Sequence, residues 1–96
     1  MRIPLSELSP GRRVRVVHRE IPVEVTRDAS GEVTARSLLC THMGCEVRWI
    51  ESSSSYHCPC HGGVFDASGM AVAGPPTRPL AEVPTRIIDS TLWVGG

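Results

Sequence analysis

The residues that could do chemistry are concentrated in one short stretch of the chain. All four cysteines and three of the four histidines lie between residues 40 and 61 of a 96-residue sequence. The first group reads Cys40-Thr41-His42-Met43-Gly44-Cys45, and the second reads Cys58-Pro59-Cys60-His61-Gly62-Gly63. Thiolates and imidazoles are ligands for soft and borderline metals, and cysteines alone also form disulfides. The pattern therefore indicates a metal centre, a disulfide framework or both.

Three kinds of site are compatible with these two groups. A structural zinc site would use two thiolates and two imidazoles, but finger spacing separates a cysteine pair from a histidine pair carried by a helix. Here each group mixes the two residue types. A framework of disulfides alone allows three connectivities and leaves His42 and His61 without a role. The third kind is a two-iron, two-sulfide cluster with cysteines on one iron and histidines on the other.

Short β-strands are expected to position these groups. Segments of alternating or β-branched residues are separated by turn sequences such as Asp28-Ala29-Ser30-Gly31 and Asp66-Ala67-Ser68-Gly69. We expect strands over residues 14–17, 21–26, 33–39, 47–50, 70–73, 80–83, 86–88 and 92–94. The expected fold class is all-β, a sandwich or small barrel of antiparallel sheets. The serine run 52–55 is expected to form an exposed hairpin tip.

The core is expected to come from the apolar residues of these strands. A chain of this length supports one domain with a small core, so cross-links are expected to contribute to its stability. With only four aromatic residues available, burial is the favoured prediction for both tryptophans. His18 and His57 are expected at the surface. The predicted core residues are Val14, Val16, Ile21, Val23, Val25, Leu38, Val47, Trp49, Leu80, Val83, Ile87, Leu92 and Trp93.

Composition excludes several classes of function. Ten acidic residues balance ten basic residues, which gives zero formal net charge and argues against a nucleic-acid-binding protein. No apolar run approaches the roughly 20 residues that cross a bilayer. The first residues, Met1-Arg2-Ile3-Pro4-Leu5, lack the apolar stretch of a signal peptide.

The two cysteine and histidine groups resemble the cluster-binding boxes of Rieske iron–sulfur proteins. C-T-H-M-G-C, twelve residues and then C-P-C-H-G follow the pattern of that family. The extra cysteine in each box is similar to the disulfide-bearing branch found in quinol-oxidising cytochrome bc complexes. The segment Gly74-Pro75-Pro76 resembles the family's proline loop, and the similarity extends upstream through Pro4–Leu8.

The resemblance implies one Rieske-type [2Fe-2S] cluster per chain. Cys40 and Cys58 would hold the inner iron, and His42 and His61 would hold the outer one. Cys45 and Cys60 would form a disulfide, and His61 would be the catalytic residue that meets a quinol. Neutral imidazoles make such a cluster less negative than four thiolates do. Rieske potentials therefore lie at roughly −150 to +300 mV, against about −400 mV for plant-type ferredoxins.

Two positions depart from the pattern of high-potential family members. Those proteins carry a Ser and a Tyr whose hydroxyls donate hydrogen bonds to cluster and ligand sulfur, whereas this chain has Gly63 and Phe65. We expect a potential in the lower part of the Rieske range, below about +150 mV. Gly63→Ser and Phe65→Tyr are each expected to raise it. A low potential favours a donor such as menaquinol.

The resemblance also implies an architecture and a function. A cluster-binding subdomain at about 39–78 would be inserted in a β base formed by 1–38 and 79–96, within a single Rieske-type domain of small antiparallel sheets. The expected function is electron transfer as the soluble head of a quinol:cytochrome c reductase iron–sulfur subunit, a redox subunit rather than an enzyme by itself. Its partners would be a quinol, a c-type cytochrome and a cytochrome b subunit, on the extracytoplasmic (periplasmic) side of a bacterial membrane.

Alternatives of other classes stay open. Such a subunit needs a membrane anchor and a hinge, and neither is found among these residues. We expect either a piece of a longer chain, attached through that anchor or a partner subunit, or a free protein. The alternatives are a stand-alone Rieske electron carrier, which would be cytoplasmic, or the small subunit of an arsenite-type oxidase. A zinc-stapled binding module is the remote alternative.

Overall fold

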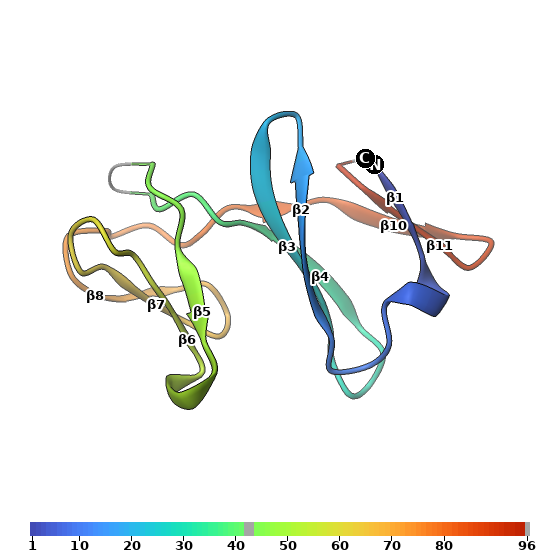
Figure 1. The fold of residues 1–96 in the computed structure, drawn as a ribbon, viewed down its shortest axis with the longest axis horizontal. Coiled ribbons are helices and arrows are strands. Elements are labelled where there is room, and N and C mark those ends of the chain that lie inside the picture. The colour runs from blue at the N-terminus through green and yellow to red at the C-terminus, as the bar shows by residue number, and fades with distance from the viewer. Residues whose placement is uncertain (42–43, 96) are drawn as a thin grey trace. The chain divides into compact units, whose positions relative to one another are not determined.

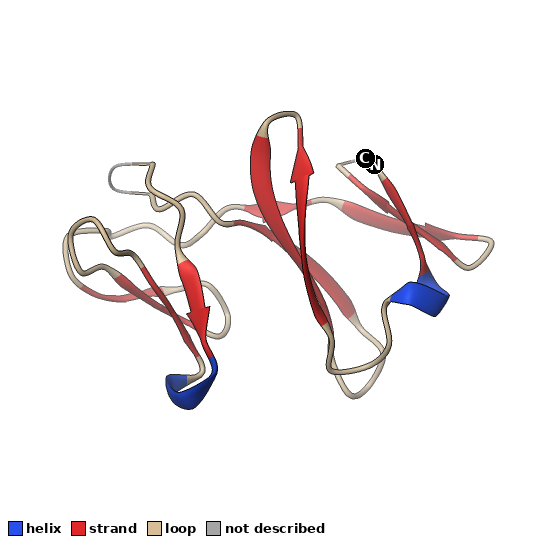
Figure 2. Cartoon of the chain, viewed as in Figure 1, coloured by secondary structure: helices blue, strands red, loops and turns tan. Residues whose placement is uncertain are grey.

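The protein is built from short antiparallel strands in two compact units. The structure is a computed structural model and describes residues 1–41 and 44–95. The first unit comprises Met1–Ser37 and Glu82–Gly96, and the second is the continuous segment Leu38–Ala81. Strands make up nearly all regular structure in both units (Figures 1 and 2). The prediction of an all-β fold is confirmed.

The first unit contains two antiparallel sheets. One has the strand order β1 (Arg2–Pro4), β11 (Thr91–Val94), β10 (Thr85–Ile88). The other has the order β2 (Arg13–His18), β3 (Ile21–Arg27), β4 (Val33–Ser37), β9 (Glu82–Val83). A short 3-10 turn, η1 (Leu5–Glu7), follows β1. These sheets form the part of the chain that flanks the second unit in sequence at both ends.

The core of the first unit follows the two-residue period of its strands. In β11, Leu92 and Val94 are buried while Trp93 points outward, with the Arg2 guanidinium 5.8 Å from its ring centroid. Predicted burial is wrong for Trp93, Ile21 and Ile87, which are 38, 39 and 53% exposed. Trp93 lies on the outward face, Ile21 adjoins a tight turn, and Ile87 lies on an edge strand. The hydrophobic core of this unit consists of Leu8, Val23, Val25, Ala35, Leu92 and Val94.

The second unit contains one four-stranded antiparallel sheet. Its order is β5 (Arg48–Ile50), β6 (Ser55–His57), β7 (Val64–Asp66), β8 (Ala71–Ala73). Tyr56 in β6 pairs with Trp49 on one side and Phe65 on the other, and the Trp49 and Tyr56 rings meet edge to face at 4.9 Å. Its hydrophobic core consists of Leu38, Cys40, Val47, Tyr56, Cys58, Phe65 and Leu80. Two of the four cysteines are therefore core residues.

The serine run is only partly an exposed tip. The 3-10 turn η2 (Glu51–Ser53) and the left-handed Ser54 reverse the chain between β5 and β6. Ser55 already belongs to β6 and is 8% exposed, because it pairs with Ile50 and Asp66 in neighbouring strands. The prediction of an exposed tip is wrong at Ser55. His57 is exposed as expected, whereas His18 is half-buried.

The sequence Asp-Ala-Ser-Gly occurs once in each unit and forms the same turn. In each copy, one carboxylate oxygen of Asp accepts hydrogen bonds from the backbone N–H groups two and four residues later, at 2.9–3.0 Å. The glycine adopts a positive φ, which glycine reaches without strain. The two copies, Asp28–Gly31 and Asp66–Gly69, join β3 to β4 and β7 to β8.

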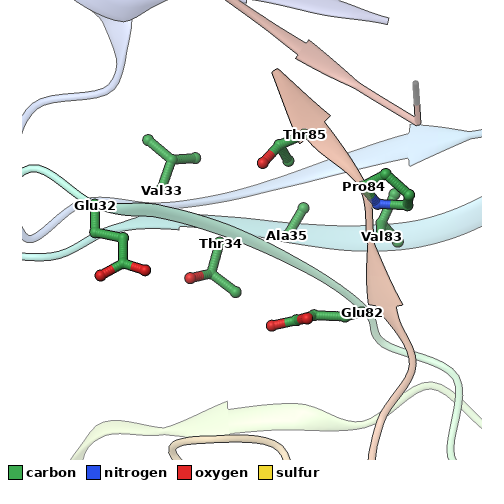
Figure 3. A pocket seen from close by; sticks show the side chains of 8 residues that line it. All are labelled: Glu32, Val33, Thr34, Ala35, Glu82, Val83, Pro84 and Thr85. Atoms are coloured by element: carbon green, nitrogen blue, oxygen red, sulfur yellow. The ribbon is translucent and has the colours of Figure 1, made fainter. Parts of the chain in front are cut away.

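A surface hollow of about 200 Å³ lies in the first unit. It is lined by Glu32–Ala35 and by Glu82–Thr85 (Figure 3). None of the described cysteines and histidines between residues 40 and 61 is among its lining residues. A search of the described residues for a helix long and apolar enough to span a membrane found none.

Candidate metal centre

The two cysteine and histidine groups form loops with one shared backbone pattern. In the first loop the Cys40 N–H donates to the Cys45 carbonyl at 2.7 Å, and the Gly44 N–H donates back to the Cys40 carbonyl at 3.0 Å. In the second loop the N–H groups of Cys58 and Gly62 make the equivalent bonds, to the carbonyls of Gly63 at 2.8 Å and of Cys58 at 3.2 Å. The loops therefore present Cys40 and Cys58 at equivalent first positions.

Antiparallel pairing holds both loops at their bases. The first is closed by a bridge between Leu39 and Glu46, and the second lies between β6 and β7, where His57 pairs with Val64. In each loop the glycine of the pattern has a positive φ, +74° at Gly44 and +72° at Gly62. A residue with a Cβ rarely adopts this conformation. The glycines are therefore required by loop closure.

A disulfide joins the two loops. Cys45 and Cys60 are bonded, with 6.5 Å between their Cα atoms and a sequence separation of 15. This is the pairing that the resemblance implied, and it is confirmed. It ties the last residue of the first loop to the third residue of the second. The bridge restrains the two loops relative to each other in a unit with a small core.

The other two cysteines are free and buried. Cys40 is 5% exposed and Cys58 is 3% exposed, and both belong to the apolar cluster that contains Tyr56 and Phe65. A pure disulfide framework would have paired them. Two free thiols at equivalent positions of two linked loops are instead suitable ligands for a soft metal centre.

Of the two candidate histidine ligands, the structure describes only His61. His61 is exposed at the outer part of the second loop, beside the exposed Cys60. His42 lies outside the described residues. Within residues 1–41 and 44–95, no three Cys, His, Asp or Glu side chains gather in the arrangement of a metal site. Among the described residues, the candidate donors are thus two buried thiols and one exposed imidazole.

The segment Gly74-Pro75-Pro76 packs directly on the second loop. A Cβ placed on Gly74 would lie 2.7 Å from the Gly63 Cα and 2.9 Å from the Gly62 carbonyl oxygen. Pro75 is exposed and Pro76 is buried. Real Cβ atoms do not approach backbone this closely, so the contact requires glycine at position 74.

One contact in this region was not predicted from the sequence. Thr41, the residue between Cys40 and His42, donates a hydrogen bond from its hydroxyl to the Arg78 carbonyl at 2.8 Å. The bond joins the first loop to the chain just after the proline-containing segment. A lone Thr in a loop carries no sequence signal for a partner this far along the chain.

Gly63 and Phe65, the two positions at which high-potential family members carry hydroxyl groups, are both buried. Phe65 is fully buried in the apolar cluster with Cys40 and Cys58. Gly63 is buried against Pro76 and near Cys58. Neither side chain can donate a hydrogen bond. The surroundings of the two free thiols at these positions are therefore apolar.

These features fit a [2Fe-2S] cluster of the Rieske type. Buried thiols on two disulfide-linked loops, with an imidazole on the exposed side, are the donors that such a cluster uses. The model of the Rieske [2Fe-2S] domain family matches residues 2–84. The chain belongs to this family, whose domain binds a [2Fe-2S] cluster.

Similar proteins include several iron–sulfur subunits. The chain is 36% identical over 81 residues to a putative Rieske 2Fe-2S iron–sulfur protein, YhfW, of Bacillus subtilis, covering 84% of this chain and 16% of that protein. It is 42% identical over 64 residues to the cytochrome b6-f complex iron–sulfur subunit of Chlorobaculum thiosulfatiphilum, covering 67% of this chain and 35% of that subunit. The chain therefore spans about a third or less of these relatives.

Solved structures share the fold. The plasma membrane Rieske protein PetC3 of Synechocystis PCC 6803 superposes with a TM-score of 0.74 at 32% identity, over 88% of this chain and 86% of that one. A chain of a hyperthermophilic respiratory Complex III gives 0.76 at 28% identity, over 96% and 72%. The ferredoxin of carbazole 1,9a-dioxygenase from Nocardioides aromaticivorans gives 0.67 at 27% identity, over 97% and 92%. Together with the family match, these similarities support a role in electron transfer.

Proposed function

We propose that the chain is the cluster-bearing head of an iron–sulfur subunit that oxidises a quinol and reduces a c-type cytochrome. Cys40 and Cys58 would hold the inner iron of the cluster, and His42 and His61 the outer iron. When bound, the cluster supplies a one-electron acceptor whose charge is less negative than that of a four-thiolate cluster.

One observation carries the proposal. Two loops with the same hydrogen-bond pattern are linked through Cys45 and Cys60, and each leaves its first cysteine free and buried. A disulfide between the loops constrains them without using the thiols needed as ligands. The burial of Cys40 and Cys58 keeps these sulfur atoms away from water and from competing thiols.

His61 is the residue proposed to meet the quinol. Its side chain is exposed, and an imidazole bound to a metal through one nitrogen keeps a second nitrogen for a hydrogen bond. A quinol hydroxyl could donate a hydrogen bond to this second nitrogen. Removal of hydrogen from a quinol requires both an electron acceptor and a proton acceptor, and these functions would adjoin each other at His61.

The particular complex is inferred from the similar proteins. The b6-f subunits and the Complex III chain favour a membrane complex with a cytochrome b subunit. The proposed location of the domain is the extracytoplasmic side of a bacterial membrane. We also propose that residues of about 39–78 form the cluster-binding subdomain within a base formed by 1–38 and 79–96. The separation of the chain into units at Leu38 and Ala81 supports that division.

Analysis of iron and sulfide tests the cluster and its ligands. The purified protein is expected to contain two irons and two acid-labile sulfides per chain and, when reduced, to show the low average g value of mixed Cys and His ligation. His61→Ala is expected to lose the cluster. The matched control is His57→Ala, because His57 is exposed and lies outside the loop. Stoichiometric zinc without labile sulfide would exclude the proposal.

A second candidate is a stand-alone Rieske electron carrier. The match to the dioxygenase ferredoxin, which spans 92% of that chain, favours this alternative. The two functions differ in their electron donor. Isolation of the tagged protein from solubilised membranes of its source organism is expected to recover a cytochrome b if the first proposal holds. Recovery from the soluble fraction, with reduction by a flavin reductase and not by a naphthoquinol, would favour the carrier.

A further inference from the structure

We propose that Gly63 is a positioning residue that allows the Pro76 ring to occupy the space beside Cys58. This inference deepens the proposed function, because Cys58 is one of the proposed cluster ligands. A side chain at position 63 and the Pro76 ring would compete for one volume. Position 63 therefore lacks a hydroxyl donor because the Pro76 ring fills the space that a serine side chain would need.

Distances at Gly63 carry the inference. A Cβ placed on Gly63 would lie 2.8 Å from Pro76 Cγ, 3.0 Å from Pro76 Cδ and 3.6 Å from Cys58 Cβ. The 2.8 Å distance is shorter than carbon atoms tolerate, the 3.0 Å distance is tighter than nearly all contacts of a Cβ atom, and the 3.6 Å distance is ordinary van der Waals contact. Gly63 and Pro76 are both buried. The proline ring therefore fills the space that a Ser or Ala side chain would need.

Conformational preference does not explain the glycine at this position. Gly62 and Gly74 have positive φ values of +72° and +85°, whereas Gly63 is not among the residues with positive φ. A Cβ on Gly62 would meet no atom within 4 Å. Gly62 is thus required by backbone conformation, and Gly63 is required by packing.

The contact between Gly74 and the backbone of Gly63 restricts movement of the Pro76 ring away from Gly63. Gly74 lies two residues before Pro76, and a Cβ built on it would approach the backbone of Gly63 to 2.7 Å at Cα and 3.0 Å at N. The segment from Gly74 to Pro76 therefore rests on residue 63 at two points. A larger residue at position 63 would have to displace this segment as a whole.

The inference changes the expectation for Gly63→Ser. A serine hydroxyl could donate to sulfur near Cys58 only after the ring atoms of Pro76 are removed or displaced. The single substitution is therefore expected to loosen the proline-containing segment rather than simply to add a hydrogen bond. The donor effect should appear when Pro76→Ala accompanies it, since alanine lacks both Cγ and Cδ.

A double-mutant cycle tests the competition for space. Gly63→Ala is expected to lower the thermal unfolding midpoint of the purified protein by about 4–8 °C or more, as a loss of roughly 1 kcal/mol or more does in a domain of this size. In the Pro76→Ala background the same substitution should lower it by less than half as much. If Gly63→Ala alone fails to fold and the double variant folds, the competition is supported equally well.

Gly62→Ala is the matched control. It should lower the midpoint through its positive φ, and by the same amount with Pro76 or with Ala at position 76. Additive effects at Gly63 as well would overturn the inference, because residues that do not compete for space show additive changes. The cycle can also be run on protein from which iron has been removed. Its outcome is therefore separate from failure of the proposed cluster function.

Reduction potentials supply the second readout. With Pro76 present, Gly63→Ser and Gly63→Ala should have equal potentials or should both lose iron. With Pro76→Ala, the Ser variant should have the higher potential of the two. A Gly63→Ser protein that gains potential and keeps its thermal stability with Pro76 in place would overturn the inference.

Discussion

The Thr41 hydroxyl donates a 2.8 Å hydrogen bond to the backbone carbonyl of Arg78, 37 residues further along the chain. Thr41→Val removes the donor at nearly constant size and leaves the carbonyl without this partner. We expect a loss of about 0.5–1.5 kcal/mol in the free energy of unfolding. Thr41→Ser keeps the hydroxyl and should retain most of that stability. A Thr41→Val protein as stable as the wild type, with the loss found in Thr41→Ser, would show by urea denaturation that the methyl group matters instead of the hydrogen bond.

The second prediction concerns the bridge between the loops. Replacement of both Cys45 and Cys60 by alanine should lower the free energy of unfolding by about 2–4 kcal/mol, because the unfolded chain regains the freedom that the disulfide removes. Alkylation of the denatured, unreduced, iron-free protein should modify Cys40 and Cys58 and leave the other pair protected. Four modified cysteines under these conditions would contradict the bridge.

The third prediction concerns Phe65, which is fully buried in one apolar cluster with Cys40 and Cys58. Phe65→Tyr introduces a hydroxyl donor among the proposed ligand sulfurs. A hydrogen bond that stabilises the reduced state by about 1–2 kcal/mol raises a one-electron potential by roughly 40–90 mV. Protein-film voltammetry measures the shift. Phe65→Leu, which adds no hydrogen-bond donor, is the control, and its reduction potential should not rise. An unchanged potential in Phe65→Tyr would mean that the hydroxyl does not reach sulfur.

The fourth prediction concerns acid stability and the turn at Asp28. The Ser30 hydroxyl, followed by backbone N–H groups of the turn, lowers the pKa of Asp28 below its usual value of 3.8. A lowered pKa in the folded protein adds stability above pH 3.8 that is lost as the pH falls through the folded-state pKa. The stability difference between the wild type and Asp28→Asn should therefore be larger at about pH 6 than at about pH 2.5.

Ser30→Ala provides the control for Asp28. It removes the largest cause of the lowered pKa and leaves the carboxylate in place, so the pH dependence should become weaker without vanishing. Urea unfolding of the wild type and both variants at the two pH values measures the effect. A stability difference that is independent of pH would contradict the assignment.

Local sequence patterns predicted much of the fold. β-branched residues such as Val23 and Val25 indicated a strand, and the two Asp-Ala-Ser-Gly sequences indicated turns, because these preferences act over a few residues. The resemblance of the two boxes to the Rieske family implied the Cys45–Cys60 bridge. Short strands without apolar alternation were missed, namely β1, β6 and β7. β1 pairs with β11, which is distant in sequence, whereas β6 and β7 are only three residues long and pair with the strands next to them in the chain.

The contacts that shape the candidate site could not be predicted in this way. Nothing in the local sequence indicates that Thr41 bonds to Arg78, or that Pro76 fills the space at Gly63. The error at Trp93 has a similar cause. A large aromatic side chain favours burial, but the register of β11 assigns the inward positions to Leu92 and Val94. Tertiary packing overrode the preference of the single residue.

The second unit leaves and rejoins the first at adjacent positions of one strand pair. β4 ends at Ser37, β9 begins at Glu82, and Arg36 pairs with Glu82 across them. The whole segment 38–81 is therefore, for the rest of the chain, a single long hairpin connection. Insertions, deletions or a complete exchange within it leave every strand register of the first unit formally unchanged. Recombination between homologous genes at the two ends of this segment would therefore exchange residues 38–81, with both cysteine and histidine groups, as one unit.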